Sequence, residues 1–341
     1  MAKSRKSVTM ADIAKEMGVS VVTVSKALSD QKGVSQKLKA DILEKAHELG
    51  YELPGLREKK TYTIGVILAQ RYLDDFGSFY WRMYQEVVAW AGKRHLFVIY
   101  ENITEEMAKK NLMPHMVTEK KIDGLLLIGN PGFEYSDFLE KNAGLPLVFL
   151  DFYNKRETVD CVISDGFYGS YLLTNYLLEK GHRKIGYVGT LYATDSITDR
   201  FLGYTKALLE RGITPREDYI IPDRDVETGL RENYPEYRFP EDMPTAFVCN
   251  CDFIANLVIR DLLRKGYQVP EEVSVVGFDN DPNPAFAELP LTTYEVDMGA
   301  MAGKAVNYLV KRMEGEVTNP GIHIVKGKLV EKDSVRALER K

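Results

Sequence analysis

The sequence predicts an α/β protein with a small all-α head and a larger core made of two lobes of doubly wound parallel sheets. Three observations predict this fold class. The first fifty residues carry apolar positions at helical spacing in three short stretches. From Tyr62 onward, short apolar runs alternate with amphipathic helical stretches. This alternation starts a second time near Asp160, which predicts a second lobe and a cleft at the carboxyl ends of the strands.

Composition agrees with a globular protein. The 341 residues are 45% hydrophobic and 28% charged. No apolar run is long enough to span a membrane, and the N-terminal MAKSRKSVTM lacks the apolar centre of a secretory signal, so a cytoplasmic location is expected. The three cysteines, Cys161, Cys249 and Cys251, are expected to be buried thiols rather than a disulfide or zinc site.

Charge is distributed unevenly along the chain. Residues 1–60 carry a net charge of +4, whereas the remaining residues carry −9. A mildly basic head on an acidic body favours a head that binds a polyanion and a body with a separate task.

The head begins with two predicted helices joined by a tight turn, over residues 9–29. Gly18 can end the first helix because glycine adopts positive φ readily, and Ser20 can cap the second. The apolar side chains form one stripe on each helix: Met10, Ile13, Ala14 and Met17, then Val19, Val24, Ala27 and Leu28. This is the layout of a helix-turn-helix that reads the DNA major groove, although a helical hairpin that only packs shows the same pattern.

A third helix completes the head. Ser35 caps it, and its apolar stripe runs through Leu38, Ile42, Leu43, Ala46 and Leu49. Pro54-Gly55 then ends the helical pattern before a charged link. The expected domains are a DNA-binding head at 1–53, a short hinge or linker at 54–61 and a core at 62–336.

The core elements are expected to alternate between strands and helices, and the alternation starts again at the strand 160–163. Strands are predicted at 63–69, 96–100, 123–128, 147–151, 160–163, 184–188, 246–249, 273–278 and 322–325. Helices are predicted at 78–94, 105–119, 135–141, 167–180, 196–211, 253–265 and 298–314. The N-lobe is expected to hold 62–160 and 290–320, and the C-lobe to hold 161–289 and 321–336.

Signatures of enzymes are missing from the sequence. It contains no GxxxxGK[ST] phosphate loop, no GxGxxG after the first strand, no GxSxG and no HExxH. The five histidines lack the spacing of metal ligands, and His182 in the GHRK run is expected to be a solvated helix cap. We therefore expect no enzyme activity, no cofactor and no metal site.

Three polar residues follow strands or begin helices on the expected cleft side. Asp165 and Asp279 each follow a strand, and Arg200 lies near the start of a helix. Each could simply cap a helix or form a surface pair. Two carboxylates and one guanidinium facing a cleft are also what a hydroxyl-rich ligand requires.

The sequence resembles the lac repressor (LacI/GalR) family of bacterial transcription regulators over nearly its whole length. The residues that carry this resemblance are Val8–Ser29, Val34-Ser35, Gly50-Tyr51, Ile64–Val66, Asp123–Leu126, Gly181–Gly189, Arg200–Tyr204, Ser274–Asp279, Leu291–Thr293 and Leu329–Ser334. The resemblance implies an operator-binding helix-turn-helix head on a periplasmic-binding-protein-like core that senses a small molecule between its lobes. It also implies a homodimer on palindromic DNA.

The resemblance assigns roles in the head. Base-reading positions fall on Val21, Val22 and Lys26, and phosphate-binding positions fall on Thr23 and Ser25. The predicted DNA-binding set is completed by Thr9, Ser20 and Leu56. Leu56 is the one leucine in the shortened link that could act as a minor-groove wedge, and a simple flexible tether is the alternative.

In the core, the resemblance places effector contacts on Asp165, Arg200 and Asp279. Phe79, Tyr80 and Tyr192 are expected to offer an apolar face to a sugar ring, and Cys251 takes the place of a cleft asparagine of the lac repressor. A glutamine of that protein aligns with Val296. These departures leave the identity of the effector open.

We therefore expect a sequence-specific transcription regulator, a repressor controlled by a small carbohydrate-like effector and active as a homodimer without membrane association. The alternative is a cytosolic sugar-binding or sugar-modifying α/β protein with an unrelated helical head. The basic helix-turn-helix distinguishes the two, because a protein that only binds a ligand does not need one.

Overall fold

The computed structural model describes residues 8–29, 31–49, 51, 61–72, 79–156, 158–226, 229, 236–282 and 288–338. The chain divides into two units, Met1–Thr61 and Tyr62–Lys341, which are described separately below. No helix in these ranges is long and apolar enough to cross a membrane.

The head consists of three helices around a small apolar centre. They are α1 (Met10–Met17), α2 (Val21–Leu28) and α3 (Gln36–Glu48). The buried residues are those of the predicted stripes: Ile13, Ala14, Val24, Ala27, Ile42 and Ala46. Gly18 ends α1 at φ 66°, and Ser20 and Ser35 cap the next two helices, as predicted.

Each lobe of the core is built on a six-stranded sheet. The first sheet is entirely parallel in the order β11-β5-β4-β3-β1-β2. Its strands are β1 (Thr63–Ala69), β2 (Phe97–Ile103), β3 (Gly124–Ile128), β4 (Leu147–Leu150), β5 (Asp160–Ser164) and β11 (Ile322–Val325). Its central strands are apolar throughout because helices cover both faces.

The second sheet has the order β12-β10-β9-β8-β6-β7, and only β12 runs antiparallel to its neighbour. Its strands are β6 (Ile185–Val188), β7 (Ile220–Ile221), β8 (Ala246–Cys249), β9 (Ser274–Asp279), β10 (Thr292–Glu295) and β12 (Lys328–Val330). The short strands β7, β10 and β12 are absent from the sequence prediction.

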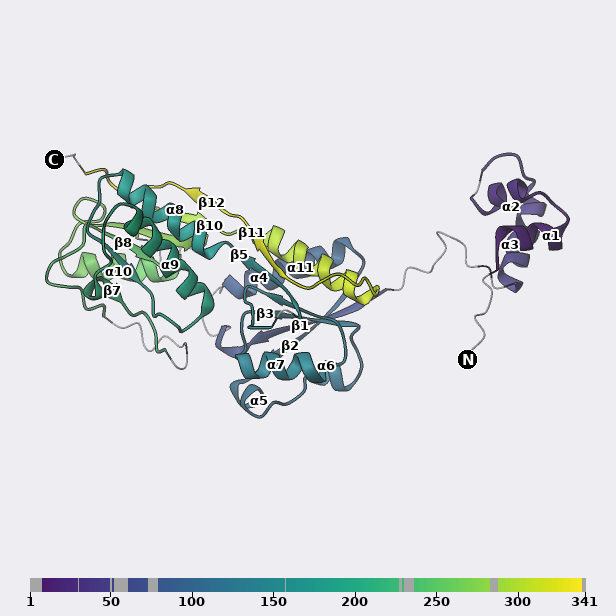
Figure 1. The fold of residues 1–341 in the computed structure, drawn as a ribbon, viewed down its shortest axis with the longest axis horizontal. Coiled ribbons are helices and arrows are strands. Elements are labelled where there is room, and N and C mark those ends of the chain that lie inside the picture. The colour runs from purple at the N-terminus through teal and green to yellow at the C-terminus, as the bar shows by residue number, and fades with distance from the viewer. Residues whose placement is uncertain are drawn as a thin grey trace. The chain divides into compact units, whose positions relative to one another are not determined.

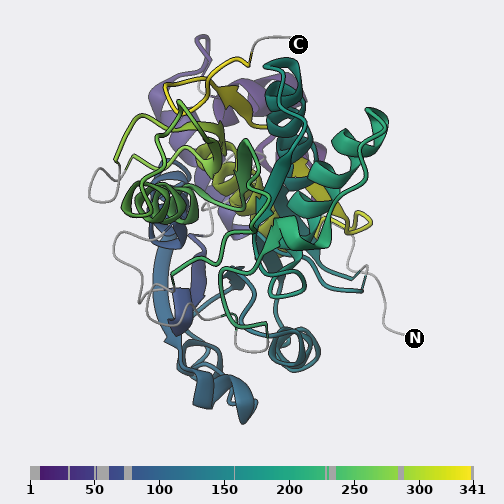
Figure 2. The same cartoon turned by 90° about the vertical axis from the view of Figure 1, so that its left-hand side faces the viewer.

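The helices divide between the lobes (Figure 1). The first lobe carries α4 (Phe79–Lys93), α5 (Glu105–Lys109), α6 (His115–Thr118), α7 (Phe133–Asn142) and α11 (Met298–Met313). The second carries α8 (Gly166–Glu179), α9 (Asp195–Glu210) and α10 (Asp252–Arg264), with a short 3-10 turn at Glu217–Tyr219. A second 3-10 turn, at Gln70–Tyr72, follows β1 in the first lobe. Figure 2 views the core from the side of this second lobe.

Three strands lie in a different lobe from the one expected. The strands at 160–164 and 322–325 belong to the first sheet, and the strand at 292–295 pairs with β9 in the second. The chain therefore crosses between the lobes after β5, after β10 and after β11. The expected helix at 105–119 is also two short helices, because Pro114 interrupts it.

His182 is buried rather than solvated, contrary to the sequence prediction. Its side chain is 0% exposed, with Nδ1 2.9 Å from the Thr245 hydroxyl and Nε2 3.2 Å from the Arg336 carbonyl oxygen. Burial lowers its pKa to about 4, although the Arg336 carbonyl bond opposes this shift. The three cysteines are buried thiols, as expected.

Candidate functional site: the head surface and the cleft between the lobes

The first turn of α2 presents two valines to solvent. Val21 is 47% exposed and Val22 63% exposed, and Ser25 and Lys26 are exposed on the same helix. Val24 and Ala27 point the other way into the head core. Apolar side chains exposed at a helix start are suited to contact thymine methyl groups in the major groove.

Three of the predicted DNA-binding residues also take part in the caps at the start of α1 and α2. The Ser20 hydroxyl accepts a bond from the Thr23 amide at 3.1 Å, and the two hydroxyls lie 2.8 Å apart. The Thr9 hydroxyl donates to Asp12 at 2.7 Å in a capping box. Leu56 lies outside the described residues.

In the core, Arg200 is the central side chain of the cleft. It projects from α9 and is only 6% exposed. One guanidinium nitrogen donates to the Asn250 carbonyl oxygen, and another lies 3.6 Å from Oδ1 of Asp279. The guanidinium plane covers the Phe278 ring at 3.8 Å. Within the described part of the chain, Nε of Arg200 has no hydrogen-bond partner, although it is buried.

Asp279 lies at the end of β9 in an unusual backbone conformation. Its φ is 114°, and that of Asn280 is 52°, so two consecutive residues other than glycine are left-handed. Among the described residues, Oδ1 of Asp279 has no hydrogen-bond partner. Burial raises the pKa of Asp279 well above its usual range, although Arg200 opposes the shift.

Asp252 fixes the loop that carries Asp279. Its carboxylate accepts bonds from the Thr293 hydroxyl at 2.6 Å and from the Asp281 amide at 2.8 Å. A Cβ at Gly277 would lie 2.2 Å from Oδ1 of Asp252, so only glycine fits there. Burial raises the pKa of Asp252 to about 7, opposed by these two hydrogen bonds.

The first lobe contributes Tyr80 and Asp151 to the same region. The Tyr80 hydroxyl donates to Asp151, whose pKa burial raises to about 6 against the opposing influence of Arg200. Asp151 follows β4 with φ 68°. Tyr80 also packs against Phe79 and Tyr72, with ring centres 5.3 and 4.1 Å away. These three rings form an aromatic wall on the first lobe.

The remaining predicted effector residues differ in their burial. Asp165 is half-buried and caps α8 by accepting a bond from the Tyr168 amide at 3.1 Å. Cys251 is buried at the start of α10. Tyr192 is 80% exposed, so its ring does not join the aromatic wall. The structure thus brings Arg200 and Asp279 together, whereas Tyr192 stays in solvent.

A buried polar network beside the cleft is missing from the sequence prediction. Arg224 donates to Asp223 from Nε at 2.9 Å and from Nη2 at 2.7 Å. Asn250 donates to the same carboxylate at 3.1 Å, and its own carbonyl group binds Arg200. Arg224 also lies close enough to Tyr80 for an electrostatic interaction across the lobes.

Two polar contacts join the lobes directly. Arg82 on α4 pairs with Asp281 of the second lobe at 3.2 Å. The Tyr153 hydroxyl, after β4, lies 3.2 Å from both carboxylate oxygens of Asp199 on α9. Both contacts join elements that the sequence prediction assigns to different lobes.

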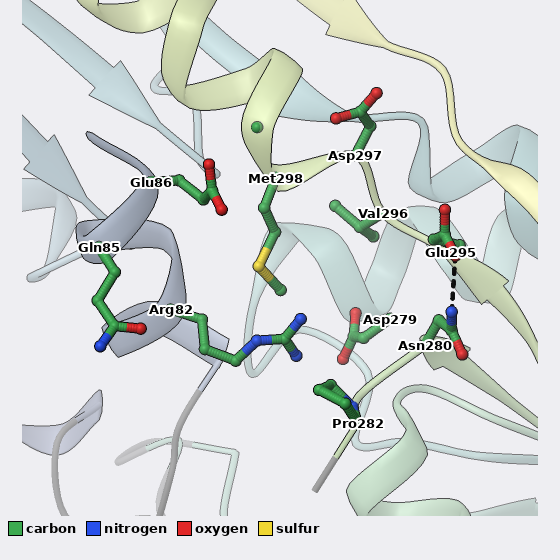
Figure 3. Close-up of a pocket in the computed structure, with 11 residues that line it drawn as sticks. Arg82, Gln85, Glu86, Asp279, Asn280, Pro282, Glu295, Val296, Asp297 and Met298 are labelled. Carbon is green, nitrogen blue, oxygen red and sulfur yellow. Dashed lines mark hydrogen bonds between the residues drawn. The ribbon is translucent and has the colours of Figure 1, made fainter. Parts of the chain in front are cut away.

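A cavity of about 500 Å³ opens beside this region. Its lining comes from α4, from the loop after β9 and from the crossing between β10 and α11 (Figure 3). Figure 3 shows the Arg82 guanidinium pointing toward Asp279, with Met298 beside it. The cavity therefore adjoins Asp279 and contacts both lobes.

Comparison with known proteins identifies both units. Residues 9–52 match "Bacterial regulatory proteins, lacI family", and residues 174–335 match "Periplasmic binding protein-like domain". The HTH-type transcriptional repressor PurR of Aliivibrio salmonicida is 29% identical over 97% of this chain and 99% of its own. The repressor of the same name from Glaesserella parasuis is 27% identical, also over 97% of this chain and 99% of its own.

Solved structures show the same fold. A transcriptional regulator CelR-cellobiose complex matches with a TM-score of 0.67 and 22% identity, covering 96% of this chain and 99% of that one. The lac repressor dimer bound to operator and the anti-inducer ONPF matches with a TM-score of 0.66 and 21% identity, covering 97% and 100%. The relatives are transcriptional repressors and regulators rather than enzymes. Both units of the chain are thus similar to bacterial regulatory proteins of the lacI family.

Proposed function

We propose that this chain is a lacI-family repressor that binds a palindromic operator through α2 and responds to a small carbohydrate-like effector held between its lobes. The observation that carries the effector assignment is the pair formed by Arg200 and Asp279. Each has a buried polar atom that lacks a hydrogen-bond partner within the described residues. A ligand hydroxyl can accept from one and donate to the other.

Operator recognition is supported by the surface of α2. Val21 and Val22 are exposed where a major-groove helix meets base edges, and Lys26 follows on the same helix. We propose that Lys26 reads a guanine and that Thr23 and Ser25 contact phosphates. A repressor acts on chromosomal DNA, so this function requires a cytoplasmic location.

Homodimer formation is supported by an apolar surface on the first lobe. Trp81 and Val88 of α4 are 40% and 38% exposed, and Phe97 on the edge strand β2 is 67% exposed. Trp81 also stacks on Tyr84, with ring centres 5.0 Å apart. Exposed aromatic groups beside an open sheet edge are typical of a protein interface.

The test separates the two functions of the chain. DNA selection with the wild-type protein defines the operator, and metabolites are then screened for release of that operator. Lys26→Ala should weaken operator binding by about 1–3 kcal/mol and relax preference at one base pair. Arg200→Ala should leave operator binding unchanged and abolish release.

Two controls make the result decisive. Circular dichroism must show that Arg200→Ala keeps the fold, and Lys26→Ala must keep the effector response at a matched operator occupancy. An Arg200→Ala protein that is folded and still released by the same metabolite at the same concentration contradicts the effector site. An unchanged selected motif for Lys26→Ala contradicts its base-reading role.

A further inference from the structure

The chain enters the core between two turns of the first lobe. Thr61 and Tyr62 lead into β1, which lies between β2 and β3 in the first sheet. The Phe97 amide donates to the Tyr62 carbonyl oxygen at 3.0 Å, and the Thr63 amide donates to the Asp123 carboxylate at 2.9 Å. The turns before β2 and β3 therefore lie on either side of the point where the segment from the head joins the core.

Both turns carry exposed cations. The exposed basic side chains before β2 are Lys93, Arg94 and His95, and those before β3 are Lys120 and Lys121. Among the described residues, Arg94, Lys120 and Lys121 have no ion-pair partner. The Lys93 ammonium lies 4.5 Å from the centre of the Trp90 ring. These charges are thus available to an external anion.

The backbone of each turn is well defined. The Arg94 amide donates to a carbonyl oxygen of α4 at 3.0 Å, and the Lys121 amide donates to one of α6 at 3.0 Å. His95 and Lys120 reverse the chain with φ values of 58° and 52°. The cations therefore project from fixed turns, so that less conformational entropy is lost when they bind.

Cations exceed carboxylates in these segments, although the core as a whole is acidic. The turns at 92–96 and 118–123 hold four Lys or Arg residues against Glu119 and Asp123. The joining segment adds Arg57, Lys59 and Lys60 against Glu58. Glu314 is exposed after α11, at the same end of the sheet. Residues 61–341 together carry a charge of −9, so this basic edge departs from the charge of the rest of the core.

Salt screening keeps this edge electrically separate from the acidic groups of the cleft. The cleft lies at the carboxyl ends of the strands, and the two turns lie at the opposite ends. The seven residues of β1 span about 23 Å, whereas the Debye length is about 8 Å at physiological salt. A polyanion beside the turns therefore interacts with their cations and only weakly with the cleft carboxylates.

We propose that this tether edge, formed by Lys93, Arg94, Lys120 and Lys121, binds the phosphate backbone of the DNA that the head occupies. The inference rests on the proposed function and adds a second DNA contact, made by the core. The ten residue steps from Tyr51 to Thr61 span at most about 36 Å, which keeps the tether edge within reach of that duplex. Lys and Arg contacts to phosphates add affinity without reading sequence.

The salt dependence of DNA binding counts such contacts. Full-length wild type and Lys120→Gln/Lys121→Gln are titrated by fluorescence anisotropy onto the selected operator and onto a random-sequence duplex of equal length. Each phosphate contact contributes about 0.9 to the slope of log Kd against log salt concentration, so the double variant should lower this slope by about two. Between 50 and 200 mM salt, the wild type should lose about tenfold more affinity than the variant on both duplexes.

Lys109→Gln/Lys110→Gln is the matched control. It removes the same charge from the same lobe, but α5 follows the other end of β2. Both lysines pair with glutamates of α5, at 3.1 and 2.6 Å. This control and the conservative variant Lys120→Arg/Lys121→Arg should both keep the wild-type slope. Circular dichroism confirms that all three variants are folded.

Two outcomes would overturn the proposal. One is an unchanged slope for the folded Lys120→Gln/Lys121→Gln protein, which is also the result if the tether edge binds an acidic protein instead. The other is an equal loss of slope in the α5 control. Failure of the proposed function looks different: a wild-type protein that selects no motif contradicts operator recognition, whereas the random-sequence duplex still reports the contact made by the core.

Discussion

Replacing His182 by glutamine should remove a large part of the acid sensitivity of the core. The buried imidazole is neutral in the folded protein, because its pKa is about 4 against an ordinary value of 6.5. As pH falls below 6.5, the unfolded chain binds a proton that the folded chain does not, so the free energy of unfolding decreases. The loss is complete near pH 4 and amounts to about 3 kcal/mol.

This loss in the free energy of unfolding is measured by urea unfolding at pH 7, 6, 5 and 4, with tryptophan fluorescence as the signal. The only two tryptophans, Trp81 and Trp90, are both in the core, so the head does not contribute. Asp151 and Asp195, with pKa values raised to about 6 mainly by burial, titrate in the same range. Their contributions to the pH dependence are the same in the wild type and the variant, so they cancel when the two proteins are compared.

The expected result is a difference in the free energy of unfolding between wild type and variant that changes with pH. The stability advantage of the wild type over His182→Gln should shrink by about 3 kcal/mol between pH 7 and pH 4. His115→Gln, which changes an exposed histidine on α6, should run parallel to the wild type. Parallel curves for wild type and His182→Gln would refute the reasoning.

Three further substitutions test other parts of the structure. Gly203→Ala places a Cβ 2.0 Å from the Phe167 carbonyl oxygen where α8 and α9 meet, and should destabilise the core by about 1–3 kcal/mol in urea unfolding. Gly92→Ala in α4 is the control, because its Cβ has open space and should not destabilise the core. Ser20→Ala removes the α2 cap bond and should lower head stability by about 1 kcal/mol, measured by circular dichroism; an unchanged melting curve would argue against the cap. Trp81→Glu should give a monomer in light scattering at micromolar concentration, and a persistent dimer would exclude this surface as the interface.

The head could be predicted because its structure follows from local sequence. The apolar stripes, Gly18 and the caps Ser20 and Ser35 all act within a few residues. Most core strands were predictable for the same reason. The lobe to which β5, β10 and β11 belong was not, because pairing partners far apart in sequence decide it. The prediction that His182 is solvated was wrong, because charged residues next to it in the sequence suggest exposure although its own side chain is buried.

The residues of the cleft were also only partly predictable from the sequence. The proximity of Arg200 and Asp279 was predictable, because Asp279 follows a strand and Arg200 lies near the start of a helix. Asp151 and Asp252 follow β4 and β8 closely, so the same rule applied consistently would have found them. Arg224 lies in a loop with no periodic pattern, and only the folded chain brings it to Asp223 and Asn250. Tyr192 follows a strand as Asp279 does, yet its ring faces solvent.

The three crossings between the lobes determine the order in which the protein can fold during synthesis. The head is complete once residue 51 has left the ribosome, and its helices depend on local contacts alone. The first sheet lacks its edge strand until β11 at 322–325 has been made, and the second lacks β12 until residue 330. A nascent chain thus presents a finished DNA-binding module for most of its translation, well before either sheet of its core is complete.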